Sequence, residues 1–140
     1  MPFDGNAERS APIRLPDAPP LEARIIDEAL NILGPNGEKW IQGDEADAQH
    51  NHCMIGAIRL ARHRLKARGD DTERLIAQVL YRGTCRRLLQ SIENFNDERG
   101  RRFGQVREAF LLAKCEALRR ARPSYPPMPG EMARLFGLSD

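Results

Sequence analysis

The sequence predicts an all-α protein: a compact array of four or five helices between an extended N-terminal arm and a proline-rich C-terminal tail. No proline occurs between Asn36 and Arg122, and helices require such proline-free stretches. Within it, apolar residues recur every three or four positions, and no segment alternates apolar and polar residues as a half-buried strand would. We therefore assign residues 1–19 to the arm, 20–122 to one helical domain and 123–140 to the tail.

The first two helices are expected at residues 21–33 and 53–68. Pro19 and Pro20 suit a helix start, and the turn at residues 34–37 contains the proline and glycines that end a helix. Gly69 is the expected end of the second helix. The second helix carries an apolar face formed by Met54, Ala57, Ile58, Ala61 and Leu65.

A third helix is expected to start after Asp70 or Asp71, whose carboxylates suit a helix N-terminus, and to bend or break into two at Gly83–Thr84. Residues 95–100 are expected to form a second loop, followed by a helix at 101–121. The apolar face of that last helix is expected to comprise Phe103, Val106, Phe110, Ala113 and Ala117, broadened by Leu111, Leu112 and Leu118. In the tail, Met132, Leu135 and Phe136 suit a short amphipathic helix that docks in a groove or packs on the same domain.

Composition points to a cytoplasmic protein. No apolar run approaches the length of a membrane span, and the first residues lack the pattern of a secretory signal. Three widely spaced cysteines suggest neither a disulfide framework nor a zinc ribbon. Residues 1–58 are acidic and residues 59–140 are basic, which permits an acidic partner but also permits the two halves to neutralise each other.

Three short motifs follow one another along the chain: Trp40-x-Gln42-Gly43, Cys53-x-x-Gly56-Ala57-Ile58, and Asn96-Asp97 before a helix with Val106 and Ala113. Their order and spacing resemble a small uncharacterised bacterial and phage domain of unknown function, common in actinobacteria. The resemblance spans roughly residues 21–121 and implies the fold outline but no reaction. The sequence departs from that pattern at Phe95, where a tryptophan is usual, and at Arg101-Arg102, where a threonine is common.

The sharpest catalytic hypothesis places Cys53 in the first turn of the second helix, capped by Asn51 or His52. The helix dipole would there favour a thiolate, and Asp97 could orient a histidine, as in a Cys-His-Asn site, so the predicted catalytic residues are Cys53, His52 and Asp97. The alternative is a small buried cysteine that packs under Trp40. A metal site of His50, His52 and Cys53, with Asp44 or Asp47, is geometrically awkward, and no metal or cofactor is assigned.

Two surfaces are candidates for binding. The segment around Trp40 and Gln42 is long for a loop in a small domain, and such loops often carry function. Asn96 and Asp97 could take part in a functional site with this loop. Their short polar side chains equally suit capping a helix or pinning the Trp40 loop by hydrogen bonds. Trp40 itself is as well suited to anchoring the core.

A basic stripe on the second helix is the other candidate surface. Arg59, Arg62, His63 and Lys66 fall on one face, where they could contact phosphates or simply be solvated. The sequence therefore predicts a small binding or accessory protein, a monomer or homodimer, that acts through an unknown protein partner rather than as an enzyme. Nucleic-acid binding through the stripe and a cysteine-dependent enzyme centred on Cys53 are the alternatives; no membrane association is expected.

Overall fold

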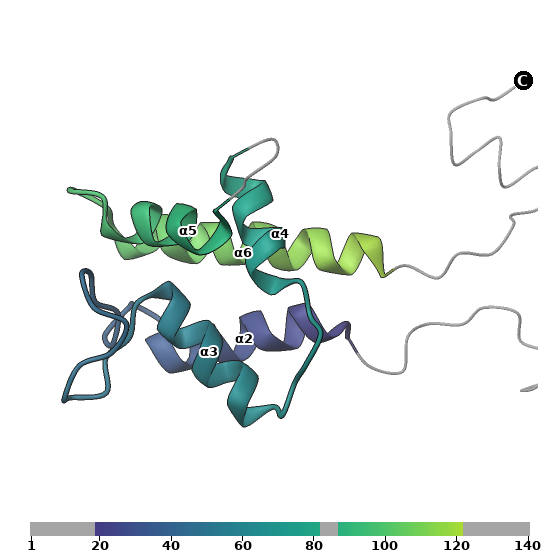
Figure 1. The fold of residues 1–140 in the computed structure, drawn as a ribbon, viewed down its shortest axis with the longest axis horizontal. Helices are drawn as coiled ribbons and strands as arrows, with labels where there is room; N and C mark the ends of the chain where they lie inside the picture. Colours follow the sequence, from purple (N-terminus) through teal and green to yellow (C-terminus); the bar gives the residue numbers. More distant parts are fainter. Residues whose placement is uncertain (1–18, 82–86, 122–140) are drawn as a thin grey trace, which may run out of the picture. The chain divides into compact units, whose positions relative to one another are not determined.

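The computed structural model describes residues 19–81 and 87–121, and within these ranges the chain forms five α-helices and no strand. The helices are α2 (Leu21–Leu33), α3 (Met54–Arg64), α4 (Thr72–Leu80), α5 (Leu88–Asp97) and α6 (Phe103–Arg120) (Figure 1). The predicted fold class is thereby confirmed. The predicted arm up to residue 18, the predicted tail with its amphipathic segment, and Gly83–Thr84 lie outside the described residues.

The helix α2 has the predicted bounds, whereas α3 is shorter than expected. It ends at Arg64 because Lys66 takes a left-handed conformation (φ 53°). The Lys66 N–H donates to the His63 carbonyl and the Ala67 N–H donates to the Arg62 carbonyl, which is the Schellman arrangement of a helix end. Lys66 therefore lies beyond the end of α3, although the predicted basic stripe places it on that helix.

The predicted interruption of the third helix separates two elements, because α4 ends at Leu80 and α5 begins at Leu88. The predicted loop starting at Phe95 is wrong: Phe95, Asn96 and Asp97 form the last turn of α5. Ile92, Phe95 and Asn96 are spaced three and four residues apart, so they share the face that α5 turns inward. Ile92 and Asn96 are buried and Phe95 is half-buried, which explains why the helix continues.

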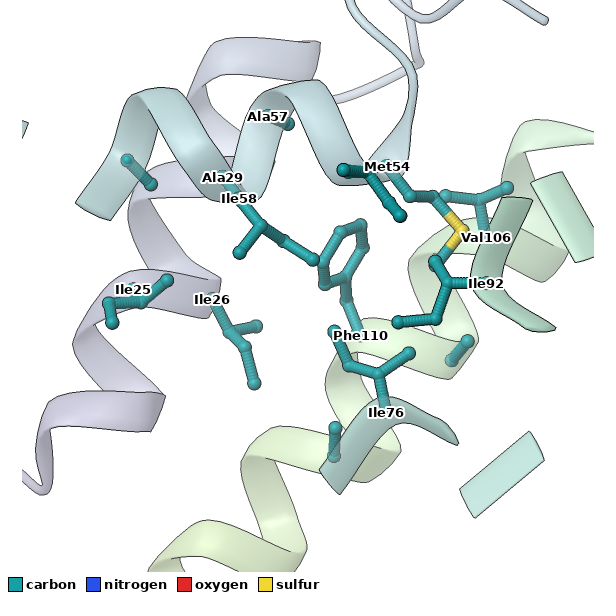
Figure 2. Packing of buried hydrophobic residues seen from close by; sticks show 14 of the residues in the cluster. Ile25, Ile26, Ala29, Met54, Ala57, Ile58, Ile76, Ile92, Val106 and Phe110 are labelled. Carbon is teal, nitrogen blue, oxygen red and sulfur yellow. The ribbon is translucent and has the colours of Figure 1, made fainter. Parts of the chain in front are cut away.

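The core lies where α2, α3, α4, α5 and α6 converge. α6 packs on α2 and α4, and α2 packs on α3. Figure 2 shows the Phe110 ring at the centre of this core, between Ile58, Met54, Ile92 and Ile76. A fully buried aromatic ring of this size contributes about 2 kcal/mol or more by removal from water.

The structure corrects the predicted apolar face of the last helix. Val106, Phe110 and Ala113 are fully buried, as predicted, but Leu112 is 50% exposed and Leu118 is 42% exposed. Among the described residues, helices cover α6 on one side only, so Leu112 and Leu118 on its other side are exposed, whereas Leu111 is half-buried.

Candidate functional site

Residues 34–53, here called the 34–53 loop, connect α2 to α3 and hold most of the predicted site residues. The loop leaves α2 through Gly34 and Gly37, both with positive φ (90° and 75°). A Cβ on Gly37 would lie 2.4 Å from the Phe103 ring, so this turn requires glycine. The Phe103 ring in turn contacts Trp40, with 6.0 Å between ring centroids.

Asn96 joins this loop to two helices. Its side chain is buried, with 1% of the residue exposed, and its Oδ1 accepts hydrogen bonds from Trp40 Nε1 (2.7 Å) and from the Met54 N–H (3.0 Å). Its Nδ2 donates to the Ile41 carbonyl (3.1 Å) and to Asp97 Oδ1 (2.8 Å). The amide therefore uses both its acceptor sites and both its donors, and it caps α3 from a residue of α5.

Gln42 and Asp97 complete the attachment of the loop to the end of α5. Gln42 Nε2 donates to the carbonyls of Asn96 (2.9 Å) and Glu98 (3.0 Å) at the C-terminal end of α5, where carbonyls lack partners within the helix. The Glu98 carbonyl also accepts from the Arg101 N–H (3.0 Å). The Gly43 N–H donates to Asp97 Oδ1 (2.9 Å). The prediction that Asn96 and Asp97 pin the Trp40 loop by hydrogen bonds is confirmed.

Cys53 is the N-cap of α3 rather than a residue of its first turn, and its Sγ accepts a hydrogen bond from the Gly56 N–H (3.4 Å). Its residue is 6% exposed, and burial raises the pKa of the thiol despite the N–H groups of the helix start. We expected the helix start to lower the pKa of this thiol and so to favour the thiolate. In the structure the pKa is raised instead. The buried position matches the structural alternative for this cysteine.

The backbone of α3 lies directly against the loop at Gly56. The Cys53 N–H donates to the Glu45 carbonyl (3.1 Å), and a Cβ on Gly56 would lie 2.1 Å from that carbonyl oxygen. Only a glycine at this position allows so close an approach. The glycine of the Cys-x-x-Gly-Ala motif therefore serves packing between the loop and α3.

The two histidines of the loop differ in environment. His50 is exposed and has a positive φ of 64°, held by a turn in which Asp47 accepts hydrogen bonds from the N–H groups of Gln49 and Asn51. His52 is half-buried, and its backbone pairs with Lys39 and Ile41. Burial, and next the nearby His50, lower the pKa of the His52 imidazole, which favours its neutral form.

Cys53, His52 and Asp97 come from adjoining segments, but their polar atoms are engaged separately. Asp97 accepts from Gly43 and Asn96, and the Cys53 thiol accepts from Gly56. Among the described residues, no hydrogen bond joins any two of the three predicted catalytic side chains. The same part of the chain contains no group of three or more His, Cys, Asp or Glu side chains placed to hold a metal ion.

A cavity of about 740 Å³ opens beside the loop, between the end of α2 and α3. Apolar lining comes from Ile32, Pro35 and Leu60, and nitrogen-bearing side chains come from Lys39, His50, His52 and Arg64. Glu38 also lines the cavity, and its carboxylate accepts a hydrogen bond from the Asn36 N–H, while Arg64 pairs with Glu28 (2.9 Å). Lys39 and Arg64 were not singled out from the sequence. The sequence gives little indication of this cavity, because its lining residues come from three separate segments.

The basic stripe of α3 is largely engaged with carboxylates. Arg59 pairs with Glu45 (2.6 Å), and Arg62 forms bidentate contacts with Asp70 and Glu73. The hydrogen bond from Arg62 holds the pKa of Asp70 far below its usual range. All four residues of the stripe line a second cavity of about 530 Å³: Arg59, Arg62, His63 and Lys66. Sequence inspection missed the link from Arg62 to Asp70, although the acidic start of α4 was visible.

The side chains of Phe95 and Arg101 contact each other. The guanidinium of Arg101 stacks on the Phe95 ring, 3.6 Å from its centroid, and Arg101 Nε donates to the Phe95 carbonyl (2.8 Å). Arg101 therefore bonds to the last turn of α5, to which Phe95 belongs.

Within the described residues, no helix has the length and apolarity that crossing a membrane requires. Neither the curated proteins nor the solved structures contain a match to this chain. A model of a family of unknown function, DUF6197, matches residues 17–114, a range that contains the 34–53 loop, Gly56 and Asn96. The chain therefore belongs to this family of unknown function.

Proposed function

We propose that this protein is a binding module that recognises a segment of a partner protein at the cavity beside the 34–53 loop. The observation that supports it is a loop without helix or strand that is nevertheless held in one arrangement by Asn96, Gln42 and Asp97. A fixed loop loses little conformational entropy when a partner binds, which favours recognition. Long ordered loops in small domains are commonly functional.

The lining of the cavity indicates the chemistry of that segment. Ile32, Pro35 and Leu60 offer an apolar surface, while the exposed Lys39 and His50 offer nitrogen donors. Such a combination suits an apolar side chain next to a carboxylate. We expect a cytoplasmic protein that needs no cofactor for this binding.

The environment of the other candidate residues also favours binding over the alternatives. A buried Cys53 with a raised pKa is a poor nucleophile, because the thiolate is the reactive form. The guanidinium groups of Arg59 and Arg62 have carboxylate partners that phosphates would need to displace.

The proposal is tested by site-specific photo-crosslinking with the full chain in an extract of the organism that encodes it. A benzophenone amino acid replaces Asn31, an exposed residue that lines the cavity, or, as a control, Arg74 on α4, whose side chain is 56% exposed. We expect a discrete protein adduct from position 31 and none from position 74. Leu60→Arg in the cavity should remove the adduct.

Mass spectrometry of the adduct should identify a peptide with an apolar side chain beside Asp or Glu. Equal adducts from both positions, no adduct, or an adduct that nuclease treatment removes would each contradict the proposal.

A further inference from the structure

The outward face of α6 is apolar, although it faces away from the core. At 100° per residue, Cys115 lies opposite the stripe of Val106, Phe110, Ala113 and Ala117 that packs inside. Around Cys115 the exposed side chains include Leu112 and Leu118, at 50% and 42% exposure. A cluster of exposed leucines on a single helix marks an interaction surface.

The spacing of this face is typical of helix pairing. Leu111, Cys115 and Leu118 are separated by four and three residues, which is the spacing of the positions that form the seam between two paired helices. Leu111 is half-buried, and it also lines a groove of about 620 Å³ with Leu30 of α2. The seam is therefore continuous with a hollow on the surface beside it.

The face is complementary to itself when two copies run antiparallel. Leu112 and Leu118 lie three residues before and three residues after Cys115, so a two-fold axis near Cys115 brings Leu112 to the level of the partner's Leu118, across the seam. The charges of the face favour the same direction. Glu108 lies toward one end of the face and Arg119 toward the other. Arg119 bonds to Glu116 of its own helix through Nε and Nη2, and antiparallel pairing brings its Nη1 toward the partner's Glu108, whereas parallel pairing brings like charges together. Glu108 has no ion-pair partner within the described ranges.

We propose that two copies of this chain form a two-fold symmetric dimer through antiparallel pairing of α6, with Leu111, Leu112, Cys115 and Leu118 at its centre. The contact is that of one short helix pair, so the dimer dissociates reversibly on dilution.

The test is the mass of the full chain in solution, measured by sedimentation equilibrium under reducing conditions. Between about 10 and about 500 µM, we expect the average mass to rise from that of one chain, 15.8 kDa, toward twice that value. The double variant Leu112→Glu, Leu118→Glu should stay at the mass of one chain over the whole range. Because both side chains are exposed, its circular dichroism and urea midpoint should match those of the natural chain.

The matched control is Leu89→Glu on α5, where a leucine is 40% exposed on another helix. This variant should dimerise like the natural chain. A single-chain mass at every concentration would overturn the proposal, whether the face is bare or covered by residues 122–140. A dimer that survives the double substitution on α6 would overturn it as well.

Discussion

A buried primary amide has two donor hydrogens and two acceptor sites, and each costs free energy if it is left without a partner. Asn96 satisfies all of them with groups from Trp40, Ile41, Met54 and Asp97. Because these partners belong to the 34–53 loop and to two helices, one side chain determines where the loop lies. Two of these partners, Trp40 and Ile41, directly follow Lys39, which lines the cavity that we propose as a binding site.

Replacing Asn96 by alanine should lower the free energy of unfolding by about 3 kcal/mol, since it leaves the buried Met54 N–H and the part-buried Trp40 Nε1–H and Ile41 carbonyl without this partner. Urea unfolding followed by Trp40 fluorescence measures this change. Asn94→Ala on the exposed side of α5 is the control and should change stability by less than about 0.5 kcal/mol. Equal effects of the two substitutions would refute the role given to Asn96.

The cysteines should differ sharply in reactivity. Cys53 is buried with a raised pKa, whereas Cys115 is exposed in the single chain, so iodoacetamide at pH 7.5 and about 10 µM protein, where the single chain is expected, should alkylate Cys115 well before Cys53. Peptide mass spectrometry after timed quenching measures both rates. In urea the difference should disappear. Faster labelling of Cys53 than of Cys115 in the folded protein would revive the hypothesis of a catalytic thiol.

At the scale of elements, α3 is positioned at both of its ends by other segments. Its start receives Asn96 from α5 and lies against the Glu45 carbonyl, and its end is held to α4 through Arg62 and Asp70. Asp70 also accepts hydrogen bonds from the hydroxyl and the N–H of the buried Thr72, so it caps α4. We expected the carboxylate of Asp70 or Asp71 to accept a backbone hydrogen bond at the start of the third helix, and Asp70 does so.

The substitution Gly56→Ala should destabilise the protein by about 2 kcal/mol or more, although alanine favours helix by up to about 1 kcal/mol over glycine. The added methyl group would overlap the Glu45 carbonyl, which belongs to the backbone and has little room to move. Gly104→Ala on α6 is the matched control, because a Cβ there meets nothing within 4 Å, and it should be neutral or stabilising. Thermal unfolding of both variants decides between packing and helix propensity at position 56.

The contacts of Asp70 should make stability depend on pH. Its pKa is lower in the folded state than in the unfolded state, so its stabilising contribution is complete above about pH 5 and falls away as the pH drops through about 4 and below. Asp70→Asn should cost about 2 kcal/mol at pH 7 and clearly less at about pH 2.

Urea unfolding at several pH values follows this loss. Asp71→Asn changes the neighbouring carboxylate, whose side chain is 68% exposed, and should cost less than about 0.5 kcal/mol at every pH. A cost for Asp70→Asn that stays constant with pH would contradict the assignment.

At the scale of the whole molecule, contacts between the described residues neutralise part of the uneven charge along the sequence. Three pairs join basic residues of the second half to acidic residues of the first: Arg59–Glu45, Arg64–Glu28 and Lys114–Asp27. The other six ion pairs of the described residues lie within the second half, so the two halves neutralise each other only in part. Exposed pairs of this kind contribute little to stability, but they reduce the positive potential of α3.

We expect no complex between the protein at about 10 µM and a short DNA duplex at about 150 mM salt, which fluorescence anisotropy measures. Glu45→Gln together with Glu28→Gln frees Arg59 and Arg64, so this variant should bind more tightly than the natural chain at about 50 mM salt. Binding by the natural chain that persists at the higher salt concentration would support the nucleic-acid alternative.

The sequence by itself determined the helices, because the spacing of apolar residues and the positions of proline and glycine act over a few neighbouring residues. The bounds of α2 and the interruption between α4 and α5 follow from such local patterns. Tertiary structure decided the rest. Trp40 and Asn96 lie 56 positions apart and Met54 and Asn96 lie 42 apart, so no local pattern announces that they share one hydrogen-bonded centre. Whether Leu112 is core or surface likewise depends on which side of α6 the other helices cover.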